Sequence, residues 1–323
     1  MSREASSLGS FIRRVGGKGV VFLTGAGCST ESGIPDYRGP QGTYRRADFV
    51  PLTFQKFMQN DYEKKRYWLR SMLGYSVMTG ASCNPAHTGL HALQQSGVVS
   101  HIITQNVDGL HHLATHGGRG RREEGSYVYY TRSEANLTEL HGNIHLVLCM
   151  GCHRVLPRDH LQGALLQANP SLFPRCTVDA ARLQPDGDYV APDSLAESVR
   201  LVHCQHCGGY LKPHVVLFGE NVSKDVVTST VEVVKGASCL VCMGTSLQVF
   251  SAYRYVLAAR EAGVPVVIVN SGKTRADGME SLRIHTDSVA GVMTTTVSEL
   301  LNISVDTDDE SGVDRRDAIH TYS

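Results

Sequence analysis

Short runs of apolar residues alternate with amphipathic stretches along most of this chain. Five runs have the length of a strand, at residues 20–24, 98–104, 215–218, 239–243 and 266–270. Near-continuous Val, Ile and Leu runs of this length predict strands that are buried on both faces, as in a parallel sheet.

The segments between these runs have the signals of helix ends. Asn84 and Pro85 supply an N-cap and a first-turn proline, and Gly97 closes the stretch. Valines repeat at helical spacing after Ser223 and stop before Gly236. Repeated alternation of strand and helix predicts an α/β fold with a doubly wound parallel sheet, Rossmann-like, that binds its ligand at the carboxyl ends of the strands.

Two segments interrupt the alternation, so we expect a smaller module beside the sheet. The expected organisation is a Rossmann-like domain at 20–40, 84–140 and 213–303, a helical module at 41–83 and a zinc-binding module at 141–212. Residues 1–19 are expected to form an N-terminal extension, 117–136 a mobile glycine-rich insertion, and 304–323 a disordered acidic tail.

A glycine turn follows the first apolar run and indicates a dinucleotide. Gly25, Ala26 and Gly27 let backbone N–H groups approach a pyrophosphate, and a helix starting there would add its positive end. The third glycine of G-x-G-x-x-G is replaced by Thr30, so the dehydrogenase fingerprint fails. The turn predicts a dinucleotide site without predicting hydride transfer.

Two C-x-x-C pairs predict a zinc site. Cys149 with Cys152 and Cys204 with Cys207 supply four thiolates, which saturate a tetrahedral ion and make the site structural. The pairs are 52 positions apart (204 − 152), which suggests an inserted loop near 170–200. The alternatives are two unrelated reduced pairs, or a nearby histidine in place of one cysteine.

Further polar turns follow other apolar runs, where the ligand of a doubly wound sheet lies. These residues are Gln105, Asn106, Val107 and Asp108, then Gly244, Thr245 and Ser246, then Asn270, Ser271 and Gly272. Each turn alone is equally compatible with a local cap. His141 begins the cysteine module and is the residue type best suited to proton abstraction near neutral pH.

Composition narrows the class of protein. The 323 residues are 41% hydrophobic, and 31 basic residues balance 31 acidic ones, so no net charge attracts nucleic acid or an acidic membrane. No apolar run approaches the roughly 20 residues of a membrane span. Nine cysteines, an odd number, suit a reducing compartment better than a disulfide scaffold.

Taken in order, these motifs closely resemble the sirtuins, the NAD-dependent protein-lysine deacylases, over about residues 20 to 290. The stretches 29–38 and 137–142 look most like the class II, mitochondrial-type branch. The matching elements are Gly25-Ala26-Gly27-x-Ser29, residues 33–38, 105–108, His141-Gly142, both cysteine pairs, Val216-x-Phe218-Gly219-Glu220, residues 244–246 and Asn270-x-Gly272.

The resemblance implies roles for the matching positions. His141 would be the general base, assisted by Asn106 and Asp108, with NAD as cosubstrate and one structural Zn²⁺ on Cys149, Cys152, Cys204 and Cys207. Val216, Phe218, Gly219 and Glu220 would pair as a strand with an acyl-lysine substrate. The implied NAD contacts are Gly25, Ala26, Gly27, Ser29, Asp36, Tyr37, Arg38, Tyr44, Gln105, Asn106, Val107, Asp108, Gly244, Thr245, Ser246, Asn270, Ser271, Gly272 and Ser288.

The implied reaction removes an acyl group from a protein lysine and yields free lysine, nicotinamide and O-acyl-ADP-ribose. The alternatives are ADP-ribosyl transfer to protein or lipoamidase activity on the same fold, and, in another class, an inactive zinc-containing binding module. Tyr67 and Arg70 imitate a tyrosine–arginine pair that some sirtuins use for acidic acyl groups, although the residues around Trp68 are equally typical of a core.

The resemblance leaves the partners and the compartment less defined. We expect acylated-lysine proteins as partners, no direct nucleic-acid binding and no membrane association, with no expectation for the oligomeric state. Arg13 and Arg14 precede the fold, but with Glu4 they make a poor transit peptide. The branch suggests the mitochondrial matrix, and the cytoplasm or nucleus is the alternative.

Overall fold

The structure is a computed structural model that describes residues 7–39, 42–45, 51–116, 136–172 and 183–302. The expected tail at 304–323 lies outside the described residues, as does the expected insertion at 117–136 apart from Asn136. Among the described helices, none combines the length and the apolar character that crossing a bilayer would require.

A six-stranded parallel sheet confirms the predicted fold class. Its strand order is β3-β2-β1-β7-β8-β9, and every neighbouring pair is parallel. Three of the predicted runs become the central strands β1, β2 and β7, and a fourth becomes β8. The bounds are β1 Val20–Thr24, β2 Val99–Thr104, β3 Leu137–Glu139, β7 Cys239–Met243, β8 Val266–Val269 and β9 Leu282–Ile284.

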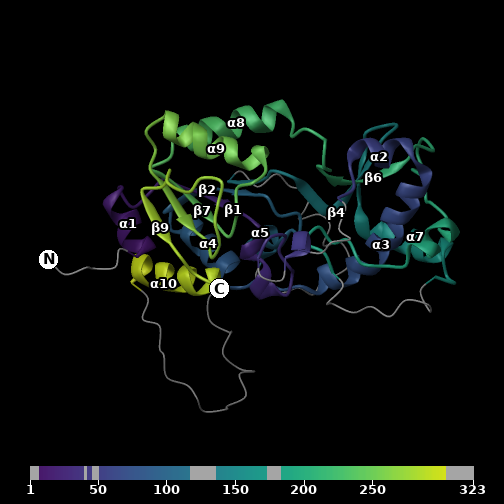
Figure 1. Ribbon diagram of the computed structural model, residues 1–323, viewed down its shortest axis with the longest axis horizontal. Helices are drawn as coiled ribbons and strands as arrows, with labels where there is room; N and C mark the ends of the chain where they lie inside the picture. Colours follow the sequence, from purple (N-terminus) through teal and green to yellow (C-terminus); the bar gives the residue numbers. More distant parts are fainter. Residues whose placement is uncertain (1–6, 40–41, 46–50, 117–135, 173–182, 303–323) are drawn as a thin grey trace, which may run out of the picture.

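Helices cover both faces of this sheet because its strands are apolar on both sides (Figure 1). Along β1, Val20 and Phe22 pack with one group of helices, and Val21 and Leu23 pack with the other. The first group is α1 Leu8–Arg14, α4 Pro85–Gln95 and α10 Val289–Leu301, and the second is α8 Lys224–Lys235 and α9 Phe250–Glu261. We call this part of the molecule the large lobe.

Helix α1 corrects the expectation that the fold begins at Val20. Leu8 and Ile12 are buried at the first and fifth positions of α1, where they join the core formed with α4 and α10. Ser7 caps α1 by accepting a hydrogen bond from the Ser10 backbone N–H, at 3.1 Å. Residues from Ser7 onward therefore belong to the large lobe and are not an extension from it.

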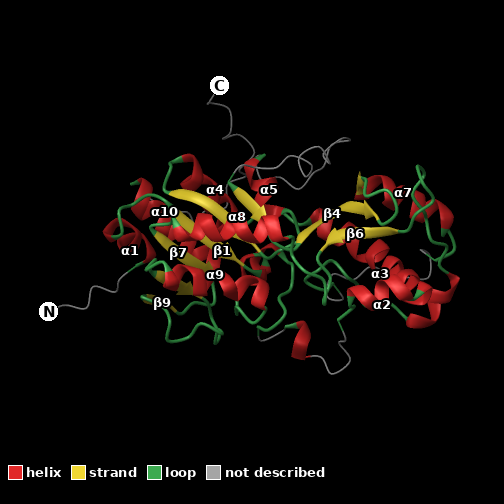
Figure 2. Ribbon diagram, turned by 90° about the horizontal axis from the view of Figure 1, so that it is seen from above, coloured by secondary structure: helices red, strands yellow, loops and turns green. Residues whose placement is uncertain are grey.

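A second, smaller lobe lies beside the large one (Figures 1 and 2). It contains an antiparallel sheet in the order β5-β4-β6 and three main helices. The two modules expected at 41–83 and 141–212 share one core here, where Trp68 and Met72 pack with Val147 and Cys149. The bounds are β4 Gly142–Cys149, β5 Val155–Pro157, β6 Leu211–Val215, α2 Phe54–Gln59, α3 Asp61–Gly80 and α7 Arg158–Ala168.

The apolar run at 215–218 was wrongly predicted as a strand of the parallel sheet. Val215 ends β6, which pairs antiparallel with β4 in the small lobe. Phe218 makes only an isolated bridge to Thr53. A short apolar run has no periodicity that distinguishes one buried sheet from another, so its partner is decided by contacts distant in sequence.

Candidate functional site

One cleft of about 1440 Å³ runs between the carboxyl ends of the parallel strands and the small lobe. That volume exceeds the roughly 300–1,000 Å³ of an ordinary small-molecule pocket, so it has room for a dinucleotide together with a substrate side chain. The predicted residues that line it are Gly25, Ala26, Gly27, Ser29, Asp36, Tyr37, Arg38, Tyr44, Gln105, Asn106, Val107, Asp108, His141, Val216, Phe218, Gly219, Glu220, Gly244, Thr245, Ser246, Asn270, Ser271 and Gly272.

The turns after β1 and β7 pack backbone against backbone. A Cβ atom on Gly25 would lie 2.8 Å from the Gly244 oxygen, and one on Gly27 would lie 2.9 Å from the Gly244 Cα. The Gly25 N–H donates to the Met243 oxygen and the Gly27 N–H to the Gly244 oxygen. Only glycine permits this close approach. The N–H groups of Gly25 and Gly27 are bonded to backbone oxygens, so, contrary to our expectation, they are not free to bind a pyrophosphate.

The segment after β1 is also not the α-helix that the glycine turn suggested. It forms two 3-10 helices at Ala26–Cys28 and Thr30–Ser32. Gly33 ends the second with a φ of 82°, and Pro35 follows. A left-handed residue and a proline both stop a helix, so no long helix dipole points into the cleft from this turn.

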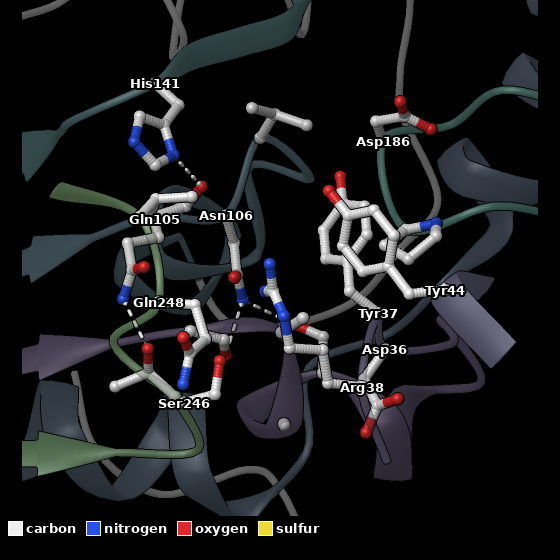
Figure 3. Close-up of a pocket in the computed structure, with 18 of the residues that line it drawn as sticks. Asp36, Tyr37, Arg38, Tyr44, Gln105, Asn106, His141, Asp186, Ser246 and Gln248 are labelled. Atoms are coloured by element: carbon white, nitrogen blue, oxygen red, sulfur yellow. Dashed lines mark hydrogen bonds between the residues drawn. The ribbon is translucent and has the colours of Figure 1, made fainter. Parts of the chain in front are cut away.

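Buried hydrogen bonds tie the β2 turn to the β1 turn (Figure 3). The Asn106 amide donates to the Gly25 oxygen and to Ser29 Oγ, both at 3.1 Å. Ser29 Oγ donates to Asp108 Oδ2 at 2.7 Å. Gln105 Nε2 reaches the β7 turn, where it donates to Thr245 Oγ1 at 2.9 Å. These amide and carboxylate groups are therefore held rigidly at the strand ends.

Two histidines that the sequence analysis did not single out lie under this network. His87 Nε2 is 3.3 Å from Ser29 Oγ, and His111 Nε2 is 3.0 Å from Thr24 Oγ1. Their rings meet edge to face at 5.0 Å. Burial lowers the pKa of His87 to about 4 and also lowers that of His111, so both rings are neutral near pH 7. The signal for His87 was its position three residues after the N-cap Asn84, where it completes a capping box.

His141 stands between the two lobes with one ring nitrogen ready to accept a proton. Its Nδ1 lies 3.0 Å from the Gln105 oxygen, and since a carbonyl only accepts, Nδ1 carries the hydrogen. In the neutral ring Nε2 is then an acceptor, and Ser251 Oγ lies 2.8 Å from it. Burial lowers the pKa of His141, with the Gln105 carbonyl opposing, so the ring is uncharged near neutral pH.

Ser251, in the first turn of α9, was missed, because a serine at the start of a helix gives no signal beyond capping. Ser288, for which the resemblance implied an NAD contact, is not among the residues that line the cleft, whereas its neighbours Asp287 and Val289 are. Its hydroxyl accepts from the Gly291 N–H at 2.9 Å, which makes it the N-cap of α10, and it lies 3.3 Å from Glu31 Oε1. A serine directly before an apolar run is a typical cap, so this signal was present in the sequence.

The segment expected to bind substrate, residues 216–220, lines the cleft. The Val216 N–H donates to the His141 oxygen at 2.8 Å, which places this segment next to the imidazole. Lys212, which is buried, lies 3.0 Å from Glu220 Oε2. Glu220 in turn accepts from the Leu217 N–H, so the loop is held in shape from the small lobe.

The four predicted cysteines come together at the far end of the small lobe. Their Sγ atoms all lie within 4.8 Å of one another, and no histidine belongs to this group among the described residues. A Cβ on Gly209 would lie 3.1 Å from Cys149 Sγ, so glycine leaves room around the sulfurs. Backbone N–H groups of Cys152 and Gly209 point at sulfur, which favours thiolates. This donor set fits one structural zinc ion.

Several proteins of known class are similar to this chain. The Sir2 family profile matches residues 25–251. The NAD-dependent protein deacylase SIR2rp2 of Leishmania major is 57% identical over 306 residues, with 93% of this chain and 96% of the relative covered. The mitochondrial NAD-dependent protein lipoamidase sirtuin-4 of Bos taurus is 40% identical, with 83% and 78% covered.

Solved structures agree with these sequence relatives. A Sir2 protein with a p53 peptide and NAD⁺ has a TM-score of 0.63 at 28% identity, and the match covers 88% of this chain and 94% of that one. Another, with a deacetylated p53 peptide and 3′-O-acetyl ADP-ribose, has a TM-score of 0.66 at 26% identity, with 92% and 100% covered. With the parallel sheet, the cleft and the four clustered cysteines, these matches show that the chain belongs to the Sir2 family.

Proposed function

We propose that this protein removes acyl groups from lysine side chains of proteins in an NAD-dependent reaction. The products are the free lysine, nicotinamide and an O-acyl-ADP-ribose. The observation that carries the proposal is His141, a neutral imidazole whose acceptor nitrogen is fixed inside a cleft with room for a dinucleotide and a substrate side chain. Relatives named as NAD-dependent deacylases and deacetylases support it.

The residues at the strand ends fit NAD. The turns after β1, β7 and β8 would hold the phosphates and the adenosine half, and Gln105, Asn106 and Asp108 would hold the nicotinamide ribose and amide. When bound, NAD supplies an electrophilic ribose carbon and nicotinamide as the leaving group. The network between Asn106, Ser29 and Asp108 keeps these polar groups in place before the ligand arrives.

His141 would act as the general base. Its Nε2 takes a proton from a hydroxyl group in the cleft, while the bond from Nδ1–H to the Gln105 oxygen stabilises the charged ring that results. Ser251 would orient the same nitrogen. The walls of the cleft would limit the access of water, which would otherwise compete with the acyl group.

The zinc ion would be structural, since four thiolates leave no open position for water. Val216, Phe218, Gly219 and Glu220 would bind the substrate backbone by strand addition. The name of the Bos taurus relative includes a mitochondrial location, which supports the mitochondrion as the proposed compartment of this chain. Fractionation of cells that express the full chain would test that location.

The decisive test is the exchange His141→Ala, assayed with NAD and acetyl-lysine peptides by mass spectrometry. Removing the base should lower nicotinamide release and deacylation together, by about 10²–10⁴-fold. His160→Ala is the matched control, because His160 is exposed on α7 and does not line the cleft. Undiminished deacylation by the His141→Ala protein would defeat the proposal, and ADP-ribose found on protein rather than on the acyl group would favour the transferase alternative.

A further inference from the structure

A tight hairpin at residues 183–189 forms part of the cleft wall opposite the dinucleotide turns. Leu183 and Tyr189 pair as an antiparallel bridge, and the Gly187 N–H donates to the Gln184 oxygen at 3.0 Å. Gly187 has a φ of +76°. A Cβ on Gly74 of α3 would lie 2.2 Å from the Gly187 oxygen, so the hairpin tip lies directly on that helix. The hairpin is thus a fixed part of the small lobe.

The hairpin binds the guanidinium group of Arg70, a residue that also lines the cleft. Arg70 Nη2 lies 2.8 Å from Asp188 Oδ2, and Arg70 Nε donates to the Tyr189 oxygen at 2.9 Å. Both side chains of the ion pair are largely buried, at 12% and 18% exposure. The Arg70 guanidinium is therefore already paired with a carboxylate, and two of its five N–H donors are used within the protein. Arg66, one turn earlier on α3, is likewise held by Asp193 at 2.8 Å.

A second carboxylate adds negative charge at the same place. Asp186 lines the cleft beside Asp188 and stands with Tyr37 and Tyr44 on the side away from His141 (Figure 3). Burial raises the pKa of Asp186 and raises that of Asp188 to about 7, with Arg70 opposing both shifts. One guanidinium and two carboxylates sum to a charge of −1, or to zero when the carboxylates share a proton. A ligand meets no net positive charge there.

We propose, resting on the deacylase function above, that Asp186 and Asp188 make this cleft reject acyl chains that end in a carboxylate and accept uncharged ones. His141 and this hairpin line the same cleft, and in this proposal the acyl chain extends past His141 toward the hairpin. A terminal carboxylate would lose its water there and face two acidic groups, and the one guanidinium beside them already has its charge paired with Asp188. An uncharged acyl chain has no such penalty.

The test compares acetyl-lysine and glutaryl-lysine versions of one peptide in NAD-dependent nicotinamide release. The wild-type protein should turn over the acetyl peptide with a higher kcat/KM. The double variant Asp186→Asn, Asp188→Asn should raise the glutaryl-to-acetyl ratio of kcat/KM by about tenfold or more, since a hydrogen bond to a charged group is restored. Adding Arg70→Met to that variant should return the ratio to its wild-type value.

Controls separate specificity from folding. Asparagine keeps an oxygen to accept from the Asp188 and Tyr189 N–H groups, so the hairpin should persist, which thermal unfolding checks. Asp61→Asn is the matched exchange, because Asp61 pairs with Lys64 on the same helix outside the cleft. It should leave the ratio unchanged. A wild-type preference for glutaryl peptide, or an unchanged ratio in the double variant, would overturn the inference.

A binding measurement makes the inference independent of turnover. Fluorescently labelled acetyl and glutaryl peptides, titrated with each protein and followed by polarisation, should show the same order of preference. If the acetyl peptide binds better and the double variant reverses this, but no nicotinamide is released, the specificity assignment stands and the deacylase function fails. Equal binding of both peptides to the wild-type protein would sink the specificity assignment instead.

Discussion

The two walls of the cleft are held in place by different means. On the large lobe, turns at the ends of β1 and β7 touch through their backbones, and both faces of the sheet are covered by helices. On the small lobe, the wall is a hairpin fixed by a glycine contact and an ion pair, on a core that also holds Cys149. The large-lobe wall therefore follows from local alternation, and the small-lobe wall depends on long-range contacts.

This difference fits what each wall would bind. The dinucleotide is the invariant part of the proposed reaction, and it would rest on backbone that few substitutions can move. The acyl chain is the variable part, and it would meet side chains on a hairpin that an Asp-to-Asn exchange can alter without moving the main chain. His141 lies between the end of β3 in the large lobe and the start of β4 in the small lobe, so it stands at the boundary between the two walls.

An exchange of cysteine for serine should affect metal content and stability very differently in the two lobes. Cys149→Ser should abolish zinc binding and unfold the small lobe, because structural zinc contributes about 10–16 kcal/mol in small domains, as much as a typical domain's whole stability. Metal analysis and thermal unfolding measure both effects. Cys239→Ser in buried strand β7 is the control, and it should keep the metal and cost only about 1–3 kcal/mol. Retained zinc in the Cys149→Ser protein would contradict the assigned site.

A smaller effect is expected where the two turns of the large lobe meet. Gly244→Ala should destabilise the protein by about 1–3 kcal/mol, since Gly244 has a φ of +60° and a Cβ would lie 2.6 Å from the Cys28 nitrogen. NAD binding, measured by calorimetry, should weaken by about tenfold or more. Gly163→Ala on α7 meets no atom within 4 Å and should stabilise by about 0.4–1 kcal/mol. Equal changes in stability for Gly244→Ala and Gly163→Ala would contradict the close backbone contact at Gly244.

The smallest expected effect is the dependence of kcat/KM and of stability on pH. Because burial lowers the pKa of His141 below its ordinary 6.5, kcat/KM should stay constant down to pH 6.5 and fall only in more acidic solution. Buried His87 contributes a decline in stability from pH 6.5 toward 4, because the unfolded chain binds protons that this ring rejects, whereas the raised pKa values of Asp186 and Asp188 contribute in the opposite direction. A pH–rate profile and denaturant unfolding at several pH values measure these trends. An acid limb centred above pH 6.5 would contradict the burial of His141.

The sequence predicted the large lobe well because its signals are local. Strands β1 and β7 were predicted with the observed bounds, and the cap at Asn84 marked the start of α4. Helix α10 was missed although Ser288 precedes it as a typical N-cap. The resemblance drew attention to a ligand role for that serine instead.

The small lobe was predicted in content but not in arrangement. The cysteine pairs indicated a zinc site, yet nothing in the spacing showed that the segment between them would return as a hairpin against α3. Arg70 and Asp188 are 118 positions apart (188 − 70), and their ion pair exists only once the lobe has folded. Tyr67 and Arg70 line the cleft, whereas Trp68 between them is buried in the core, as one interpretation of that segment expected.

Trp68 is the single tryptophan of the chain, and it lies in the core that includes Cys149, with its Nε1–H donating to the Leu211 oxygen. Intrinsic fluorescence excited in the indole band therefore reports on one half of the molecule. Loss of metal should shift the emission toward longer wavelength while the larger half keeps its circular dichroism. A single native chromophore can thus time the opening of one lobe in a protein that carries no added label.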